Sequence, residues 1–395
     1  MSALEKRLHL NKLPPRPPPG VGGKGKMKMP VHKRRDYTPI SWEEYFDHME
    51  DVQINNDTFR VYMRGSDGPV LLFLHGGGFC GLTWAVLTRS LTRLVNCQCV
   101  AIDLRGHGDT KTEDEEDLSA DRMAQDVGDV VHALYGDKSP PIMLIGHSMG
   151  GAIAVHAAKD HRVPGLIGLG VIDVVEGTAL EALTSMQSFL RGRPQAFDKL
   201  ETAIEWCVRT GQIRNHESAR ISMAGQLKIR NHEHTAADEF AEELVSSPHT
   251  TASPTVGASA TITEEDEEGG GKSTEETAKN TEFKEPSSAP TPKYVWRIDL
   301  SKTEKYWEGW FRGLSQHFLS CDVPKLLMLA GVDRLDKDLT VGQMQGKFQM
   351  QVLPQCGHAV HEDAPDKVAE VLATFMIRHR AATPTVNFKP SFPAC

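Results

Sequence analysis

The chain has 395 residues, of which 39% are hydrophobic and 25% are charged, and these proportions are ordinary for a globular protein. Its formal net charge of −9 disfavours nucleic acid as a partner, because a negative surface repels phosphate. The sequence shows neither a signal peptide nor an apolar run of about 18 residues, and its seven cysteines follow no zinc or disulfide spacing. We therefore expect an intracellular protein, cytoplasmic or nuclear, that is monomeric on its own and needs no membrane and no metal.

The first 35 residues are rich in proline, glycine, lysine and arginine and show no apolar periodicity. Such a segment cannot bury enough apolar surface to offset its ordering entropy, so residues 1–35 are predicted to form a disordered basic tail. Strand and helix signals alternate from Thr58 to Asp173, which is typical of parallel strands connected by helices. We predict an α/β catalytic core over residues 36–176 and 321–395, with a mostly parallel central sheet flanked by helices.

A glycine-rich loop follows an early apolar run of this core. Residues 69–74 are predicted to form a buried strand, and His75-Gly76-Gly77-Gly78 comes directly after it. Glycines let backbone N–H groups approach a ligand closely, and ester hydrolysis develops negative charge on an oxygen that such groups stabilise. No phosphate-binding pattern of glycines and lysine follows the strand. We therefore expect amides of Gly76, Gly77 and Gly78 to form part of an oxyanion hole.

The most specific motif is Gly146-His147-Ser148-Met149-Gly150, which follows an apolar run at residues 141–145. A strand that ends in G-x-S-x-G and turns at once into a helix holds its serine on a sharp turn, and the small residues around it let the chain double back. A glycine-rich turn without chemistry is the alternative. The helix-forming run that follows favours catalysis, so Ser148 is the candidate nucleophile and the Met149 amide a further oxyanion donor.

Two helical stretches are inserted before the last part of the core. Residues 177–246 and 293–320 lie between two predicted core strands, which is the usual place of a lid over the pocket, and we expect a helical lid there. Residues 247–292 separate the two stretches and are rich in serine, threonine, proline and glycine, with an acidic run at 264–268. This composition predicts a disordered acidic insert.

The candidate general base is a histidine between the last predicted strand and the last predicted helix. Residues 348–353 are predicted to form the strand and residues 362–372 a helix with a proline in its first turn, and His358 lies in the loop between them. A histidine at this place, after the nucleophile in chain order, is typical of the base of a serine hydrolase. His147 and His361 are neighbouring competitors, but neither occupies this place in the frame.

Two aspartates compete as the acid that orients this histidine. Asp173 follows the apolar run at 166–172, and Asp333 follows the next one at 325–332. The carboxyl ends of parallel strands meet at one edge of a sheet, so either carboxylate can orient His358 and stabilise its imidazolium. The commonest arrangement in hydrolases would choose Asp333, whereas the neighbouring charges fit a surface cluster equally well. The pattern leaves both open.

The chain closely resembles the protein phosphatase methylesterases of the α/β-hydrolase superfamily, in runs that include MSALEK, LIGHSMGGAIAVH and TEKYWEGWFRGLS. The resemblance covers most of the chain and is interrupted near 250–290. It implies an α/β-hydrolase fold and a serine carboxylesterase that removes the methyl ester from the C-terminal leucine of the protein phosphatase 2A catalytic subunit. It also implies a complex with this phosphatase and its holoenzymes that holds the phosphatase inactive.

The triad of this family falls on Ser148, Asp173 and His358, so the resemblance prefers Asp173 over Asp333. It implies no metal and no organic cofactor. An esterase of small molecules or lipids would share the triad without needing a protein partner, and it is the alternative. A protein that only binds on this fold is disfavoured, because it would not need a serine, a base and an oxyanion loop.

Overall fold

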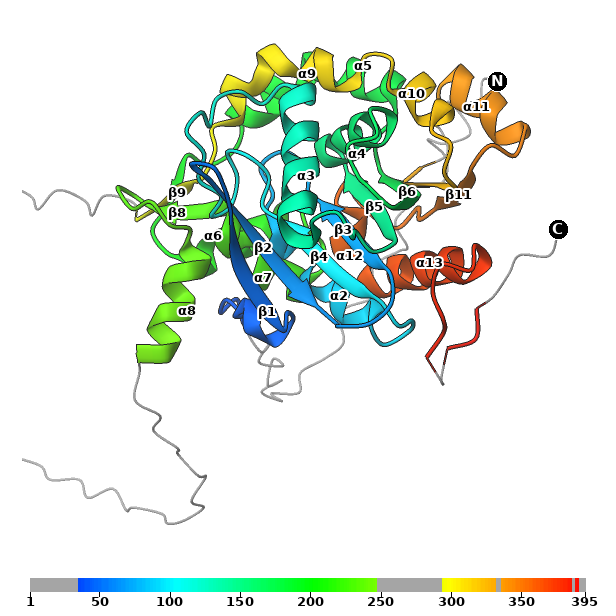
Figure 1. The fold of residues 1–395 in the computed structure, drawn as a ribbon. Helices are drawn as coiled ribbons and strands as arrows, with labels where there is room; N and C mark the ends of the chain where they lie inside the picture. Colours follow the sequence, from blue (N-terminus) through cyan, green and yellow to red (C-terminus); the bar gives the residue numbers. More distant parts are fainter. Residues whose placement is uncertain (1–34, 247–292, 332–334, 386–387, 391–395) are drawn as a thin grey trace, which may run out of the picture. The chain divides into compact units, whose positions relative to one another are not determined.

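The computed structural model describes residues 35–246, 293–331, 335–385 and 388–390 (Figure 1). The predicted disordered tail, except its last residue, and the predicted acidic insert lie outside these residues, and so does Asp333. The chain divides at Asp36 into two units, and the strands and helices described below belong to the second, Tyr37–Cys395.

A large sheet forms the centre of this unit, and within the described residues it has eight strands in the order β1-β2-β4-β3-β5-β6-β10-β11. β1 and β2 are antiparallel to each other, and β2 is antiparallel to β4, whereas all pairs from β4 to β11 are parallel. The predicted mostly parallel sheet is therefore confirmed. The strands are β1 (His48–Ile54), β2 (Asp57–Arg64), β3 (Val70–Leu74), β4 (Gln98–Ile102), β5 (Ile142–His147), β6 (Leu166–Ile172), β10 (Lys325–Leu329) and β11 (Gln349–Val352).

The register of the parallel strands brings their carboxyl ends to one edge of the sheet. Leu74 at the end of β3 pairs with Gly146 near the end of β5. His147 in turn pairs with Ile172, the last residue of β6. Leu329, the last residue of β10, pairs with Val352, the last residue of β11. Loops that leave these strands therefore begin side by side, which is where ligands bind in open α/β sheets.

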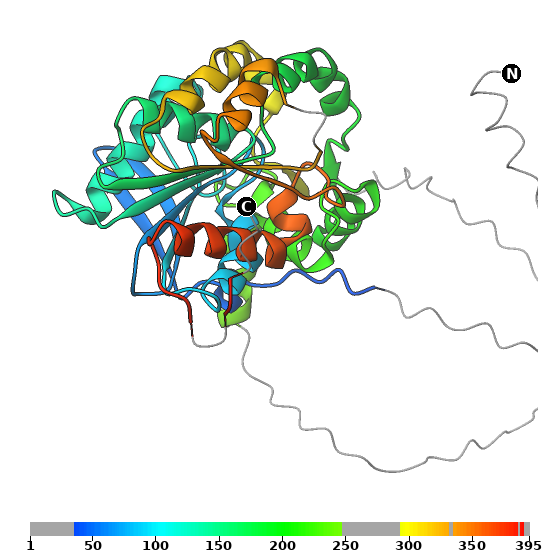
Figure 2. The same cartoon turned by 90° about the vertical axis from the view of Figure 1, so that its right-hand side faces the viewer.

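Helices cover both faces of the sheet, and alternate residues of β3 show how the two cores form. Leu72 packs with α3 (Ala120–Tyr135) and α4 (Met149–Lys159), whereas Phe73 packs with α2 (Ala85–Leu91) and α13 (Pro365–Arg378). Every residue of β3 is buried, as expected for a strand that is covered on both faces. Figure 2 shows the sheet between α13 (red) on one side and the yellow and orange helices on the other.

The helical insertion lies between β6 and β10 in the chain. Most of its predicted residues are helical, but part of it also forms a small sheet in the order β7-β9-β8, which the sequence analysis did not predict. That these elements act as a lid stays a prediction. They are α5 (Glu176–Arg191), β7 (Ala196–Phe197), α6 (Leu200–Thr210), α7 (His216–Gln226), β8 (Leu227–Ile229), α8 (Ala236–Ser246), β9 (Tyr294–Trp296), η3 (Leu300–Thr303), α9 (Glu304–Phe311) and α10 (Leu314–Ser320).

The remaining short elements flank the sheet. The predicted helix at 362–372 is in fact two, α12 (Val360–Asp363) and α13, because Pro365 begins a new helix and restricts the residue before it. Across the ranges that the structure describes, no helix combines the length and the apolar character needed to cross a bilayer. The other elements are η1 (Trp42–Glu44), η2 (Gly81–Trp84) and α11 (Lys337–Met344).

A buried carboxyl group links α12 to the elements packed against it. Glu362 is fully buried, and its carboxyl oxygens accept hydrogen bonds from the hydroxyls of Thr83 and Ser222. Burial raises the pKa of Glu362 from its ordinary value of 4.5 to about 8, because desolvation outweighs the two hydroxyl bonds that stabilise the charged form. Burial therefore favours the protonated form of this carboxyl in the folded protein.

This group makes a testable contribution to stability. At pH values between the pKa of Glu362 in the unfolded chain and its pKa in the folded chain, the unfolded chain has released a proton that the folded chain retains. The free energy of unfolding therefore falls by about 1.4 kcal/mol per unit of rising pH in this range. Glu362→Gln removes this titration and keeps the shape of the side chain. We expect the free energy of unfolding of the variant, relative to the parent chain, to rise from pH 5 to pH 8 in urea titrations. A difference that does not change with pH would contradict the shift.

Candidate active site

Ser148 occupies the sharp turn between β5 and α4. Its φ is 52° and its ψ −121°, in a region that a residue with a side chain rarely adopts. Close packing of two glycines permits the turn. A Cβ on Gly146 would lie 2.1 Å from the carbonyl oxygen of Gly150, and one on Gly150 would lie 2.4 Å from the carbonyl oxygen of Leu74. Neither position has room for a larger residue, so the glycines hold α4 against the strands and fix the serine at the sheet edge.

The structure brings Ser148, His358 and Asp173 together. His358 Nε2 lies 2.9 Å from Ser148 Oγ, and His358 Nδ1 lies 2.8 Å from Asp173 Oδ2. A carboxylate can only accept, so Nδ1 carries the proton and Nε2 is left to accept the hydrogen of the serine hydroxyl. This is the geometry in which a histidine acts as general base toward a serine.

The aspartate is held rigidly at the end of β6. Asp173 is 3% exposed, and its Oδ1 accepts a hydrogen bond of 2.9 Å from the amide of Ala330, just beyond β10. Its own amide donates to the carbonyl of Met328 at 2.8 Å. The carboxylate is thus fixed by the neighbouring strand, with Oδ2 turned toward His358. The competing Asp333 lies outside the described residues.

The loop of His358 is fixed by the two histidines that competed for its role and by an acid. His147 Nε2 donates to the carbonyl of His358 at 2.8 Å, and the His361 ring lies 4.5 Å from the His147 ring, centroid to centroid. The amide of Gly357 donates to Asp363 Oδ2 at 2.6 Å. Burial lowers the pKa of His147 and of His361 well below its usual range, so both rings stay neutral. Their geometry is that of positioning residues.

The glycine loop after β3 lies beside the serine. A Cβ on Gly76 would lie 3.2 Å from the Cβ of Ser148, which shows how closely the two backbones approach. One of the three predicted donors is already engaged, because the amide of Gly78 donates to His107 Nε2 at 3.0 Å. In this arrangement the Gly78 amide is therefore not free to donate to a ligand, and its role as an oxyanion donor stays a prediction. The amides of Gly76, Gly77 and Met149 remain as candidates.

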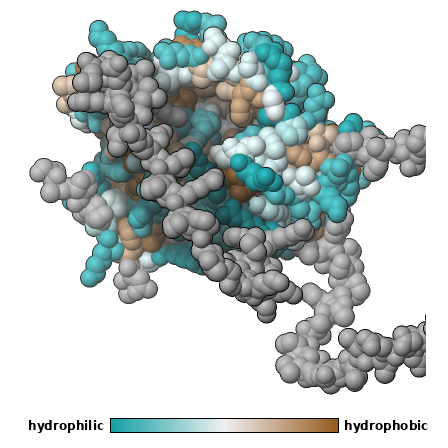
Figure 3. Space-filling view, turned by 180° about the vertical axis from the view of Figure 1, so that it is seen from behind, coloured by the Kyte–Doolittle hydropathy of each residue, from teal (hydrophilic) through white to brown (hydrophobic). Residues whose placement is uncertain are grey.

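A cavity of about 320 Å³ opens next to Ser148 and His358. Most of its wall is apolar, as is typical of ligand sites, and two helices of the insertion supply much of it. Figure 3 shows brown, hydrophobic residues around a hollow on the face turned away from the viewer of Figure 1. The apolar lining includes Leu183, Met186 and Leu190 from α5 and Trp307, Trp310 and Phe311 from α9.

Leu183, Met186 and Leu190 were not predicted as lining residues, whereas Phe189 of the same helix was among the aromatic residues expected to supply part of the lid core or the pocket wall. The first three are spaced by three and then four residues, which is the helical period, and this spacing could have indicated one apolar face. The face it predicts is partly exposed toward the cavity, however, and no residue of α5 is buried. The pattern alone therefore cannot separate a pocket wall from a face that packs on the core.

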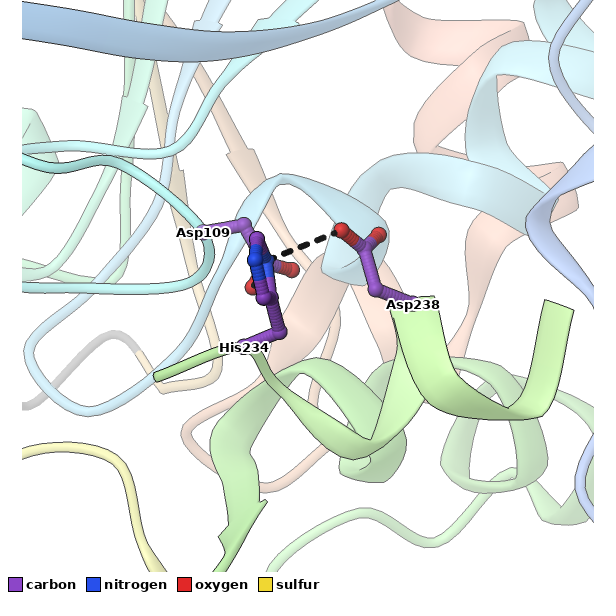
Figure 4. A group of neighbouring side chains, drawn as sticks. All are labelled: Asp109, His234 and Asp238. Atoms are coloured by element: carbon purple, nitrogen blue, oxygen red, sulfur yellow. Dashed lines mark ion pairs between the residues drawn. The ribbon is translucent and has the colours of Figure 1, made fainter. Parts of the chain in front are cut away.

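One group of three side chains within the described residues has the spacing of metal ligands. Atoms of Asp109, His234 and Asp238 lie within 4.8 Å of one another (Figure 4). A cation already sits there, because Arg60 Nη1 lies 2.7 Å from Asp238 Oδ1 and 3.6 Å from Asp109 Oδ2. Thr235 also donates to Asp109 through its amide and its hydroxyl. The guanidinium of Arg60 therefore occupies the place between the two carboxylates that a metal ion would take, and we assign no metal to this group.

Comparison with known proteins agrees with the fold. The model of the family described as "Alpha/beta hydrolase family" matches residues 71–371. A solved structure of E-2-(acetamidomethylene)succinate hydrolase superposes with a TM-score of 0.59 over 84% of this chain and 99% of that one, at 17% sequence identity, and shows the fold alone. By fold and family model, the chain is an α/β hydrolase.

Closer relatives define the branch. The chain is 59% identical to protein phosphatase methylesterase 1 of Mus musculus and of Homo sapiens, in each case over 403 residues and 100% of both chains. It is 41% identical to a probable protein phosphatase methylesterase 1 of Caenorhabditis elegans, over 91% of this chain and 83% of that protein. The chain therefore belongs to the protein phosphatase methylesterases, and it is a carboxylic ester hydrolase.

The glycine packing of the elbow can be tested with a matched pair of substitutions. Gly150→Ala places a Cβ 2.3 Å from the carbonyl oxygen of His75, so backbone must move, whereas Gly309→Ala on the exposed face of α9 meets nothing within 4 Å. We expect Gly150→Ala to lose about 1–3 kcal/mol of stability and about 100-fold in ester hydrolysis. Gly309→Ala should be neutral or slightly stabilising. Urea unfolding and turnover of a nitrophenyl ester measure both, and equal behaviour of the two variants would contradict the packing argument.

Proposed function

We propose that this protein demethylates the C-terminal leucine methyl ester of the protein phosphatase 2A catalytic subunit, with Ser148 as nucleophile, His358 as general base and Asp173 as the acid that orients the base. The observation that carries the proposal is the continuous hydrogen-bonded chain from Asp173 through His358 to Ser148, which ends at an apolar cavity. The names of the relatives support a protein phosphatase as the substrate, and the particular phosphatase and its leucine ester rest on the family resemblance.

The first half of the reaction forms an acyl-enzyme. His358 Nε2 takes the hydroxyl proton of Ser148, and Oγ attacks the carbonyl carbon of the ester. The charge on the carbonyl oxygen is stabilised by the amides of Met149 and of Gly76 or Gly77. As the intermediate collapses, the C–O bond to the methoxy group breaks, and His358 returns the proton so that methanol leaves. Asp173 stabilises the imidazolium that exists between these two proton transfers.

The second half releases the product. Water enters where methanol left, His358 takes one of its protons, and the hydroxide attacks the acyl carbon. The second tetrahedral intermediate is stabilised by the same amides, and its collapse breaks the bond to Ser148 Oγ, which regains a proton from His358. The product is the C-terminal leucine residue with a free carboxyl group, which releases its proton to solvent at neutral pH. None of these steps uses a metal or an organic cofactor.

We also propose that the protein binds the phosphatase and its holoenzymes and holds them inactive, a role that the family resemblance implies. An intracellular site of action, in the cytoplasm or the nucleus, is supported by the cysteines: Cys80, Cys97, Cys99, Cys207, Cys321 and Cys356 all carry free thiols. Free thiols are usual in a reducing compartment.

The test uses phosphatase 2A that carries the methyl ester. Incubation with the protein should lower the mass of the C-terminal peptide by that of one CH₂ group. Mass spectrometry of the digested phosphatase measures this change in mass. Ser148→Ala should reduce the rate by several orders of magnitude while still binding the phosphatase. Ser320→Ala, an exposed serine at the end of α10, is the matched control and should leave the rate unchanged.

Two outcomes would contradict the proposal. Retention of more than a few per cent of turnover by Ser148→Ala would remove this serine from the nucleophile position. Rapid hydrolysis of a short nitrophenyl ester by a chain that leaves the methylated phosphatase intact would favour the alternative, an esterase of small molecules or lipids.

A further inference from the structure

Arg193 lies where the active-site cavity meets a second cavity. The second cavity has a volume of about 470 Å³, and its wall is formed by the end of α5, the segment after it, and residues around β9 and η3. The two cavities share Leu190, Arg193 and Leu300 as lining residues. A polypeptide whose last residue reacts at Ser148 could therefore continue past Arg193 into the second cavity.

The guanidinium of Arg193 is held in place by stacking on an aromatic ring. Its Cζ lies 3.6 Å from the centroid of the Trp296 ring, a close stacking contact. Trp296 is fixed in turn, because its Nε1 donates to the carbonyl of Pro194 at 2.7 Å and its ring packs on Trp206 and Phe197. The arginine is thus presented on a rigid aromatic surface, with its orientation set before any ligand arrives.

The polar side of this guanidinium is not satisfied within the described residues. Its Nε is buried without a hydrogen-bond acceptor among the described residues. Asp299 lines the same second cavity, but its Oδ1 accepts hydrogen bonds from the amide and the hydroxyl of Ser301. Arg193 is half-buried, and the two arginines that are fully buried in the described residues are paired: Arg60 binds Asp51 and Asp238, and Arg105 binds Asp126.

The surroundings of Arg193 also disfavour its positive charge when no ligand is bound. Burial lowers the pKa of Arg193 to about 10, whereas the carboxylates around Arg105 raise the pKa of that group. Arg193 follows the carboxyl end of α5, whose partial negative charge is a weak partner by comparison with a carboxylate. A buried donor without an acceptor is costly, and an arginine presents its donors in a planar fork that matches a carboxylate.

We propose that Arg193 is a specificity-determining subsite that binds the carboxylate of an acidic side chain in the substrate segment preceding the esterified leucine. The proposal rests on the proposed function, because it takes the ester to react at Ser148. The leucine side chain then occupies the apolar wall of α5 and α9, and the preceding residues run past Arg193 toward the second cavity. The subsite makes the enzyme select tails that carry an acid at one particular distance from the ester.

The experiment uses peptides that end in leucine methyl ester and carry glutamate at each preceding position in turn, each matched with its glutamine counterpart. For the chain with Arg193, kcat/KM at one position should be at least about tenfold higher for glutamate than for glutamine. Arg193→Met should reduce that ratio to about one, and Arg193→Lys should retain part of it, since lysine keeps the charge but not the fork. Arg209→Met, an exposed arginine of α6 that pairs with Glu205, is the matched control and should keep the full ratio.

A second readout separates this subsite from the esterase reaction. Affinities of the same glutamate and glutamine peptides, made with an uncleavable C-terminal methyl amide, are measured with each variant by fluorescence anisotropy. If no peptide ester is hydrolysed, the proposed function fails, and the affinity ratio still tests the subsite. A glutamate preference equal in the parent chain and in Arg193→Met, or no preference at any position, overturns the proposal. If Arg193→Met weakens the binding only of product peptides with a free C-terminal acid, the arginine binds the product carboxylate. That result would also overturn the proposal.

Discussion

The candidate active site depends on the alignment of strand ends at one edge of the sheet. Ser148, Asp173 and His358 follow β5, β6 and β11 and are far apart in sequence, yet the parallel register places them within hydrogen-bond distance. The bond between Asp173 and His358 is charge-assisted when the imidazolium forms, and such bonds are about twice as strong as neutral ones. The amide of Ala330 just beyond β10 fixes the aspartate, so the strand between β6 and β11 also contributes to the alignment.

Backbone strain is concentrated at two of these positions. Ser148 and Asp173 both have positive φ, at 52° and 53°. Each such residue costs on the order of 1–3 kcal/mol, and it persists only where surrounding contacts determine it. For Ser148 the surroundings are the glycines of the elbow, and for Asp173 they are the backbone bond to Met328 and the side-chain bond to Ala330. The strain turns both side chains away from the sheet and toward the imidazole.

Much of this arrangement could be predicted from the sequence, since the buried strands are apolar runs and the motif residues follow them directly. The choice between Asp173 and Asp333 could not, because both follow strands that end at the same edge. The engagement of Gly78 by His107 also escaped prediction, since it joins two loops that are distant in the chain. The small sheet was missed because β7, for example, has only two residues, too few for an alternating pattern. The exposure of Arg193 to two cavities depends on tertiary packing alone.

The most direct test of the account is the role of Asp173. Asp173→Asn keeps the size of the side chain but favours the wrong histidine tautomer, so the account predicts a loss of about 10³–10⁴ in the rate of demethylation, with phosphatase binding and unfolding temperature retained. Asp333→Asn, measured side by side, should lose much less. A variant of Asp173 that keeps its rate within tenfold of the parent chain, together with a larger loss at Asp333, would contradict the central claim and move the acid to Asp333.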